Sequence, residues 1–451
     1  MRRETPRAPR WALLTGGPGG PPLVAVIVAV GVLIRSALVA GLAGGAGPAR
    51  DSDSRDYLLL AHHLGQLLTP PRGLLSLTVF HPPGYPAVVR LGEVFGGTVG
   101  VLAMQVVLAG ITLVATFAVG RRLGGQAAGV VALVIVALEP LSVLYTGLLM
   151  SETVFTALLM CSVWALLCAW RSASWRWILL AGLLLGLSVL IRPVALYLPV
   201  VLVPVTVAVV SQSRGRKALM AAALLIGFCV PVGAWVVRNA EIAGGPMVSS
   251  VDSYNLLAYR AAGAVAAETG VTMDEASRAL TDQLRSRVRP GDSEYAIAAV
   301  ERDQALRIIR QHPRGLVISS ARGFAHVVLA PGLGVVDATS PDLPRPVRTL
   351  LALYAGGIAV AVILGALAGA LLLLRRGRWR VALGVIAVAF YLIVVSSGPE
   401  GESRFRVPIL PLLAVLAGPA LVALGGDLSR RRRHSGREIV GRQASQGAAQ
   451  A

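Results

Sequence analysis

Charged residues are scarce in this chain, and their scarcity excludes most soluble folds. The sequence has 451 residues, of which 14% are charged and 55% are hydrophobic. A soluble globular protein carries about 25% charged residues. Apolar runs of roughly 20 residues, the length that a helix needs to cross hydrocarbon, recur along most of the sequence. These features predict an all-α polytopic membrane protein.

Cysteines are also few. The three of them, Cys161, Cys168 and Cys229, all lie within apolar runs. Their number and spacing exclude a disulfide framework and a zinc site, so we interpret them as small core residues.

The apolar runs predict about ten transmembrane helices. The first run contains Arg35 and has no small-residue cleavage site, so we expect a retained span and not a signal peptide. The expected spans cover residues 21–43, 97–120, 124–138, 150–170, 176–190, 194–210, 217–236, 350–374, 380–396 and 407–425.

These spans divide the chain into five regions. A basic tail, 1–20, precedes a transmembrane core, 21–236, that contains a large first loop, 44–96. A mostly helical polar segment, 237–349, follows, with a helix expected near 316–330. The C-terminal transmembrane helices occupy 350–425, and a second basic tail, 426–451, is expected to be disordered.

Acidic residues are outnumbered by basic ones, 23 to 42, and the position of the excess predicts the orientation. Nearly all of the net charge of +19 lies in the two tails and in four clusters between alternate spans, at 121–122, 171–176, 214–217 and 375–380. The positive-inside rule places these regions and both termini in the cytoplasm, here at the plasma membrane. We expect the basic residues to set topology and contact lipid headgroups, and not to bind nucleic acid.

The remaining polar residues gather on the opposite, extracytoplasmic side. The first loop contains Asp51, Asp53 and Asp56, and it also contains the turn from His81 to Pro86. Later loops supply acids and arginines at the level of the membrane surface: Glu152, Arg192, Arg238, Glu402, Arg404 and Arg406. Ionisable groups at this depth are costly and usually functional. Carboxylates can take a proton from an incoming hydroxyl, and arginines can hold a phosphate.

Several of these residues have a structural alternative. Glu152 could cap its own helix or pair with Arg192, and Arg404 and Arg406 could anchor the chain at the interface. The prolines and glycine of the turn at 82–84 could serve only to fix the backbone. Since His62 and His63 are adjacent on an amphipathic stretch, both cannot face one site, which disfavours a metal role there.

Taken in order, the motifs resemble those of GT-C-fold glycosyltransferases. Asp53-Ser-x-x-Tyr57, followed by His-Pro-Pro-Gly-Tyr-Pro at 81–86, resembles the first lumenal loop of glycosyltransferase family 39 and of aminoarabinose-transferase-like proteins, which are related to protein O-mannosyltransferases. Ser-Glu at 151–152, Arg-Pro at 192–193, Arg-Asn at 238–239 and Glu-Ser-Arg-Phe-Arg-Val-Pro at 402–408 resemble later motifs in the same order. The resemblance extends over residues 50–425.

The resemblance implies a membrane glycosyltransferase. It implies an inverting transfer of a hexose or pentose from a polyprenyl-phosphate donor to an acceptor hydroxyl on a glycan, lipid or protein of the cell envelope. It assigns the general base to Asp53, with Asp56 as second candidate. It also implies substrate binding by Tyr57, His81, Tyr85, Glu152, Arg192, Arg238, Glu402, Arg404 and Arg406. No cofactor and no metal-ligand residue follow from it, and a divalent cation is left open.

Two other functions remain as alternatives. A transporter or flippase of a lipid-linked envelope precursor would also need arginines and acids at membrane level. The concentration of acids on one side and the lack of an internal repeat disfavour it. A non-catalytic scaffold is disfavoured by the presence of acids at Asp53 and Glu152.

Overall fold

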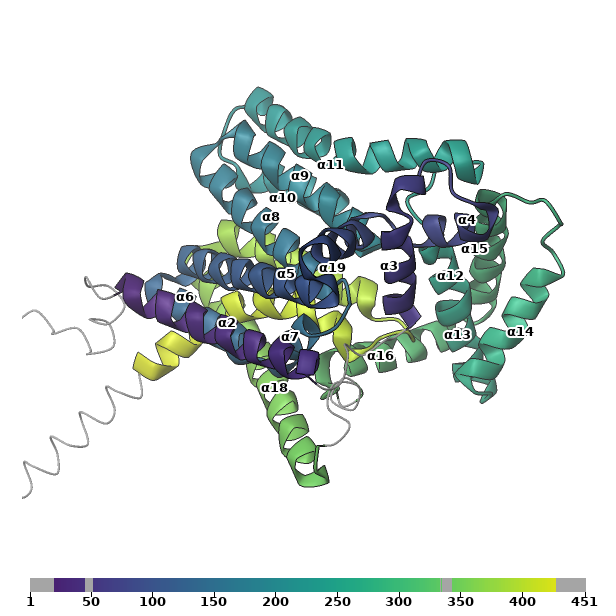
Figure 1. The fold of residues 1–451 in the computed structure, drawn as a ribbon. Helices are drawn as coiled ribbons and strands as arrows, with labels where there is room; N and C mark the ends of the chain where they lie inside the picture. Colours follow the sequence, from purple (N-terminus) through teal and green to yellow (C-terminus); the bar gives the residue numbers. More distant parts are fainter. Residues whose placement is uncertain (1–19, 45–51, 333, 335–342, 427–451) are drawn as a thin grey trace, which may run out of the picture.

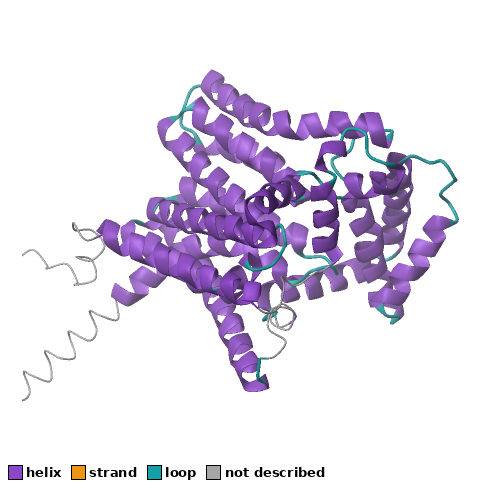
Figure 2. Cartoon of the chain, in the orientation of Figure 1, coloured by secondary structure: helices purple, strands orange, loops and turns teal. Residues whose placement is uncertain are grey.

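The computed structural model describes residues 20–44, 52–332, 334 and 343–426. Within these ranges every regular element is a helix, which confirms the predicted all-α class (Figures 1 and 2). Asp51 and nearly all of both basic tails lie outside the described residues.

Seven helices in the described part of the chain are long and apolar enough to cross a membrane, or up to eight if a bent pair counts as one span. The seven are α2 (Gly20–Gly44), α5 (Gly84–Gly124), α8 (Glu152–Ser172), α11 (Arg214–Ala243), α18 (Arg345–Arg375), α19 (Trp379–Ser396) and the span Ser403–Gly426. Two other predicted spans correspond to shorter apolar helices, α9 (Trp175–Ile191) and the segment Pro193–Val209, which includes α10 (Leu198–Val209). The protein is therefore multi-pass, and the count of ten stays a prediction.

The bent pair consists of α6 (Gln126–Leu138) and α7 (Pro140–Thr146), which meet at 57°. Pro140 has no N–H to donate, and the extended Glu139 caps α7 by accepting a hydrogen bond from the Ser142 amide at 2.6 Å. The fully buried Arg35 donates to the carbonyl oxygens of Val136 and Ala137, both at 3.1 Å. These contacts satisfy backbone groups that a break at membrane depth would otherwise leave unpaired.

A second break lies inside α5, where Gly96 and Gly97 leave helical geometry. Gly97 has a φ of 59°, a left-handed conformation that glycine adopts without steric cost. The predicted span 97–120 begins at this break. The preceding segment of α5 belongs to the region expected as the first loop.

That first loop is largely helical. It contains α3 (Ser52–His62), the short 3-10 turn Leu64–Gln66 and α4 (Arg72–Phe80). The polar segment after α11 is helical too, with α12 (Val251–Asn255), a π-helical turn (Leu256–Ala261), α13 (Ala262–Thr269), α14 (Met273–Arg285), α15 (Glu294–Gln311) and α16 (Pro313–Leu329). The helix expected near 316–330 corresponds to α16. In Figure 1, α12 to α15 gather beside α3 and α4, at one end of the long helices.

The main core lies among α5, α8, α9 and α11. Glycines allow α9 and α11 to approach closely, because a Cβ on Gly182 would overlap the backbone of Leu224, and one on Gly227 would overlap that of Leu179. This rigid packing fixes where the ends of α8 and α9 lie, and both ends carry residues of the predicted site.

Candidate functional site

Asp53 lies in the first turn of α3, where the helix dipole favours a carboxylate. The next residue, Ser54, is fully buried and donates a hydrogen bond to the Leu149 carbonyl at 3.0 Å. This contact fastens the start of α3 to the turn before α8. The Asp53 side chain remains one-third exposed, so a ligand can reach this acid at an otherwise anchored helix end.

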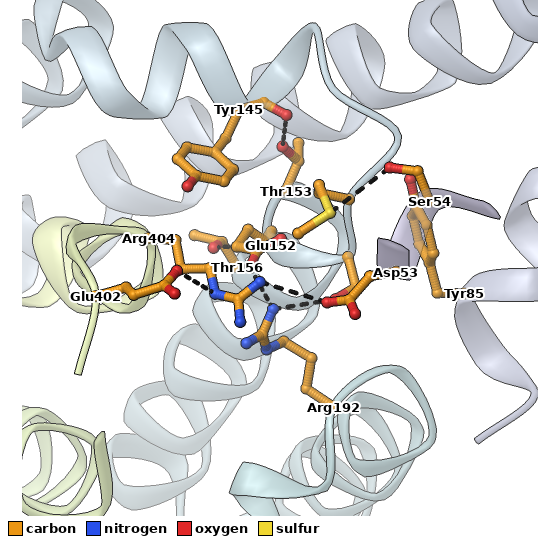
Figure 3. Close-up of polar contacts among 12 residues, drawn as sticks. Asp53, Ser54, Tyr85, Tyr145, Glu152, Thr153, Thr156, Arg192, Glu402 and Arg404 are labelled. Carbon is orange, nitrogen blue, oxygen red and sulfur yellow. Dashed lines mark hydrogen bonds and ion pairs between the residues drawn. The ribbon is translucent and has the colours of Figure 1, made fainter. Parts of the chain in front are cut away.

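Arg404 reaches Asp53 from the other end of the sequence. It lies in the 3-10 turn Ser403–Phe405, and its guanidinium is 3.3 Å from the Asp53 carboxylate and 3.0 Å from that of Glu402. Figure 3 shows the Arg404 side chain between these two acids. The structure thus brings together the first-loop acid and the last-loop arginine that the sequence analysis placed on one face.

Arg192 and Glu152 form a second, deeper ion pair at 2.5 Å, and Arg192 also donates to the Ser151 hydroxyl at 3.1 Å. Arg192 follows α9 in extended conformation because Pro193 disfavours a helical residue before it. The Glu152 side chain is only 1% exposed, whereas that of Arg192 is 18% exposed. Glu152 therefore holds the arginine, and the arginine is the member that a ligand can reach.

Phe405 connects the two arginines. The guanidinium carbons of Arg192 and Arg404 lie 5.6 and 5.1 Å from the centre of its ring. Contacts of this length are typical of cation–π interactions. The ring therefore helps to keep two like charges close together, as Figure 3 shows for the arginines themselves.

Aromatic residues form the wall beside Asp53. The ring of Tyr57 packs edge-on against Tyr85 at 4.7 Å and against His81 at 5.0 Å. Burial raises the pKa of Tyr57 to about 12. Burial also lowers the pKa of His81, against the opposing effect of Asp53 and Asp56. His81 contacts Asp56 at 3.3 Å, so Asp56 is committed to a neighbour on this wall.

Two predicted arginines lie in different surroundings. Arg238 donates to the backbone carbonyls of Leu67 and Thr78 and so fastens the first loop. Arg406 donates to three carbonyls at the end of α16, those of Val327, Val328 and Ala330. These hydrogen bonds tie both arginines to the backbone and not to the Asp53 cluster, and both side chains are buried.

The sequence analysis missed some residues of the site. In the sequence Phe405 is only one position of the motif at 402–408, and its role depends on a fold that brings Arg192 to it. Gln105 lies in an apolar span, yet it accepts a hydrogen bond from the Tyr85 hydroxyl at 2.9 Å and fixes that ring. Arg260 pairs with Glu400 at 3.2 Å and ties the polar segment to the last loop. A lone polar residue in an apolar run was the available signal for Gln105.

In the described ranges, no group of three or more His, Cys, Asp or Glu residues is placed to hold a metal ion. The arrangement offers an exposed carboxylate next to two arginines, which are themselves held by two further carboxylates. Such a set can accept a proton at Asp53 and bind an anion at Arg192 and Arg404.

The chain resembles known proteins in part of its sequence and in its fold. The family model of dolichyl-phosphate-mannose-protein mannosyltransferase matches residues 80–235. No curated protein matches the sequence. The archaeal oligosaccharyltransferase AglB from Archaeoglobus fulgidus, in complex with an inhibitory peptide and a dolichol-phosphate, is similar with a TM-score of 0.54 at 13% identity, over 92% of this chain and 51% of that chain.

Two further solved structures were found. The apo form of the Archaeoglobus fulgidus oligosaccharyltransferase has a TM-score of 0.55 at 13% identity, over 91% of this chain and 52% of that one. ArnT from Cupriavidus metallidurans, bound to undecaprenyl phosphate, has a TM-score of 0.40 at 15% identity, over 88% and 77% of the two chains. The present chain spans about half the length of the oligosaccharyltransferase. The family match and the shared fold confirm the predicted resemblance to GT-C-fold proteins.

Proposed function

We propose that this chain, with its GT-C fold, is a glycosyltransferase that moves a sugar from a polyprenyl-phosphate donor to an acceptor hydroxyl on the extracytoplasmic face of the membrane. The observation that carries the proposal is the convergence of Asp53, Arg192 and Arg404 from three distant parts of the sequence. The matched family and the dolichol-phosphate complex of AglB support a lipid-phosphate donor.

Asp53 is the general base in this mechanism. The acceptor oxygen attacks the anomeric carbon from the face opposite the phosphate, and Asp53 takes the hydroxyl proton. The bond between the anomeric carbon and the phosphate oxygen breaks, and its electron pair stays with the phosphate. The configuration of the sugar is inverted, since a single displacement is made.

The arginines stabilise the leaving group. The donor is a phosphodiester with one negative charge, and the leaving polyprenyl phosphate carries one charge more. Arg192 and Arg404 are placed to neutralise the charge that develops in the transition state, where preorganised cations act most strongly. Glu152 and Glu402 hold these arginines in place, and Phe405 supports both.

The aromatic residues beside Asp53 have a role in shaping the site. Tyr57, His81 and Tyr85 shape the sugar side of the site. Asp56, paired with His81, serves as a positioning residue.

The orientation follows from the charge pattern. The basic loops lie at the opposite ends of α5 and α8 from Tyr85 and Glu152. With those loops and both termini in the cytoplasm, the Asp53 cluster faces the extracytoplasmic side.

The test is transfer of radiolabelled sugar from polyprenyl-phosphate donors to membrane-extract acceptors by the purified protein. Asp53→Asn should lower the turnover by about 100-fold or more, since a positioned base contributes roughly 10²–10⁴-fold. Asp274→Asn is the matched control, because Asp274 also lies in the first turn of a helix outside the spans, and it should retain wild-type activity.

Near-normal turnover by Asp53→Asn would exclude that residue as the base. If label stayed on the lipid for every donor with the wild-type protein, while lipid-linked sugar crossed the bilayer of proteoliposomes, the flippase alternative would replace the proposal.

A further inference from the structure

A large cavity lies at the end of the helix bundle opposite the Asp53 cluster. It has a volume of about 810 Å³ and is formed by the final turns of α5, α8 and α10 and by the start of α19. Ligand pockets typically have volumes of about 300–1,000 Å³. The cavity is thus large enough for a small molecule or for the headgroup and upper chain of a lipid.

Five arginines line this cavity: Arg121, Arg122, Arg171, Arg378 and Arg380. The segments that supply them carry no acid, because residues 94–138, 153–240 and 343–399 contain neither Asp nor Glu. All but Arg122 are exposed. The cavity therefore concentrates positive charge that its own walls do not neutralise, and it should attract an anion.

Two of the five arginines are also structural. Arg122 donates to the Leu167 carbonyl at 3.2 Å, and Arg378 donates to that of Leu123 at 2.9 Å. These hydrogen bonds satisfy carbonyl groups in the last turns of α8 and α5. Substitutions that test ligand binding are therefore best made at the other three arginines, Arg121, Arg171 and Arg380.

The rest of the lining is apolar and aromatic. Phe117, Trp164 and Trp170 form much of the wall, together with Leu167 and Val209. The Trp170 indole donates to the Thr206 hydroxyl at 3.3 Å, which fixes its ring. An inorganic anion gains nothing from contact with such an apolar surface, whereas an acyl chain can pack against it.

The cavity lies at the level of one membrane surface when the Asp53 cluster lies at the other. Arg171 lies 19 residues after Glu152 on the same helix, which corresponds to about 28 Å at 1.5 Å per residue. The hydrocarbon core of a bilayer is about 30 Å thick. When the Asp53 cluster lies at one interface, the cavity lies at the other, at the level of phospholipid headgroups.

We propose that this cavity binds an anionic phospholipid of the cytoplasmic leaflet, with the phosphate among the arginines and the upper acyl chain against the aromatic wall. Basic pockets between transmembrane helices suit anionic headgroups in this way. The site is separate from the sugar-transfer site, and the inference does not depend on sugar transfer; it shares only the membrane orientation that the charge pattern indicates.

The experiment uses tryptophan fluorescence as the reporter. The chain has seven tryptophans, of which Trp164 and Trp170 line the cavity, so the informative quantity is the difference in quenching between the wild type and the pocket variant. Phosphatidylglycerol with brominated acyl chains is added to the purified full chain in detergent at 150 mM salt, and quenching of tryptophan fluorescence is followed. The pocket variant is Arg121→Gln/Arg171→Gln/Arg380→Gln. The matched control is Arg176→Gln/Arg375→Gln/Arg376→Gln, which removes the same charge from the same face outside the cavity.

The wild-type protein should bind phosphatidylglycerol well ahead of brominated phosphatidylcholine. The pocket variant should bind it roughly 100-fold more weakly, since each arginine near the surface contributes about a factor of five. The control should lose much less affinity than the pocket variant, because its three arginines do not line the cavity. Should the pocket variant fail to fold, Arg171→Gln alone should still weaken binding about fivefold.

Three outcomes would overturn the proposal. The first is equal binding of phosphatidylcholine and phosphatidylglycerol. The second is an equal loss in the pocket and control variants, which would mean diffuse surface attraction. The third is displacement of the lipid by millimolar inorganic phosphate, which would make this a site for free phosphate.

Discussion

From the buried pair of Glu152 and Arg192 we predict the order of stability of three variants. We consider Arg192→Gln, Glu152→Gln and the double variant. Because the Glu152 carboxylate is 1% exposed and Arg192 is 18% exposed, removal of the arginine leaves the more deeply buried charge without its partner. Removal of the glutamate leaves a guanidinium that still contacts Ser151 and the ring of Phe405.

The magnitude follows from this asymmetry. Breaking a buried pair by deleting one partner costs about 3–5 kcal/mol. Arg404 also interacts electrostatically with Glu152, so we expect Arg192→Gln to cost about 3 kcal/mol, at the lower end of that range. In the double variant no carboxylate is stranded, and two amides can hydrogen-bond, so the cost should fall to roughly 1 kcal/mol.

The assay is unfolding of the purified protein by titration with SDS in mixed micelles, which reports the free energy of unfolding. The double variant should be more stable than Arg192→Gln alone. The exposed pair Asp303–Arg307, at 2.8 Å, serves as a control, since its neutralisation should change stability by less than about 1 kcal/mol. A double variant no more stable than Arg192→Gln would refute the argument that the buried carboxylate needs this arginine.

Three further predictions concern catalysis, pH and packing. Arg404→Lys should lower sugar transfer by roughly 10- to 100-fold in the same radiolabel assay, since lysine lacks the planar fork that can hold phosphate and carboxylate together; unchanged transfer would contradict this role. Burial lowers the pKa of His81, so the neutral imidazole stabilises the fold fully above a pH of about 6.5, and this stabilisation is lost as the pH falls below that value. The melting temperature of the wild type should therefore exceed that of His81→Gln by less at pH of about 5 than at about 7.5. A constant difference would argue against this. Gly323→Ala should destabilise the protein by about 1–3 kcal/mol and slow transfer, because its Cβ would overlap the Gly398 carbonyl oxygen in the last loop, whereas Gly357→Ala, with open space around it, should be tolerated in the same melting and transfer assays.

Much of this architecture could be predicted from the sequence. Long apolar runs predict spans because a chain that crosses hydrocarbon must be apolar and must pair its backbone groups within a helix. Every expected span coincides with a helix in the described residues. The pairing of Glu152 with Arg192 was among the alternatives that the sequence offered, because charged residues at membrane depth need partners. For Asp53 and Arg404 the sequence predicted only a common side of the membrane, and their contact is a finding of the structure.

The roles of the remaining arginines could not be predicted in this way. Arg238, Arg404 and Arg406 look alike in the sequence, each next to a predicted membrane surface. Only the fold decides that Arg404 reaches a carboxylate while the other two cap backbone carbonyls. The helices of the first loop were missed for a related reason, since short helices outside the membrane are stabilised by tertiary packing more than by their own sequence.

Arg35 has a consequence for the way in which the protein is made. Its partners at Val136 and Ala137 follow it by about a hundred residues, so α2 leaves the ribosome long before they exist. Until then only the Gly31 carbonyl of its own helix, at 3.0 Å, is available to the guanidinium. An arginine at the centre of a span costs about 2.5–3.5 kcal/mol during insertion. The guanidinium therefore finds its full set of partners only once α6 has been made, which couples the packing of α2 to a later step of translation.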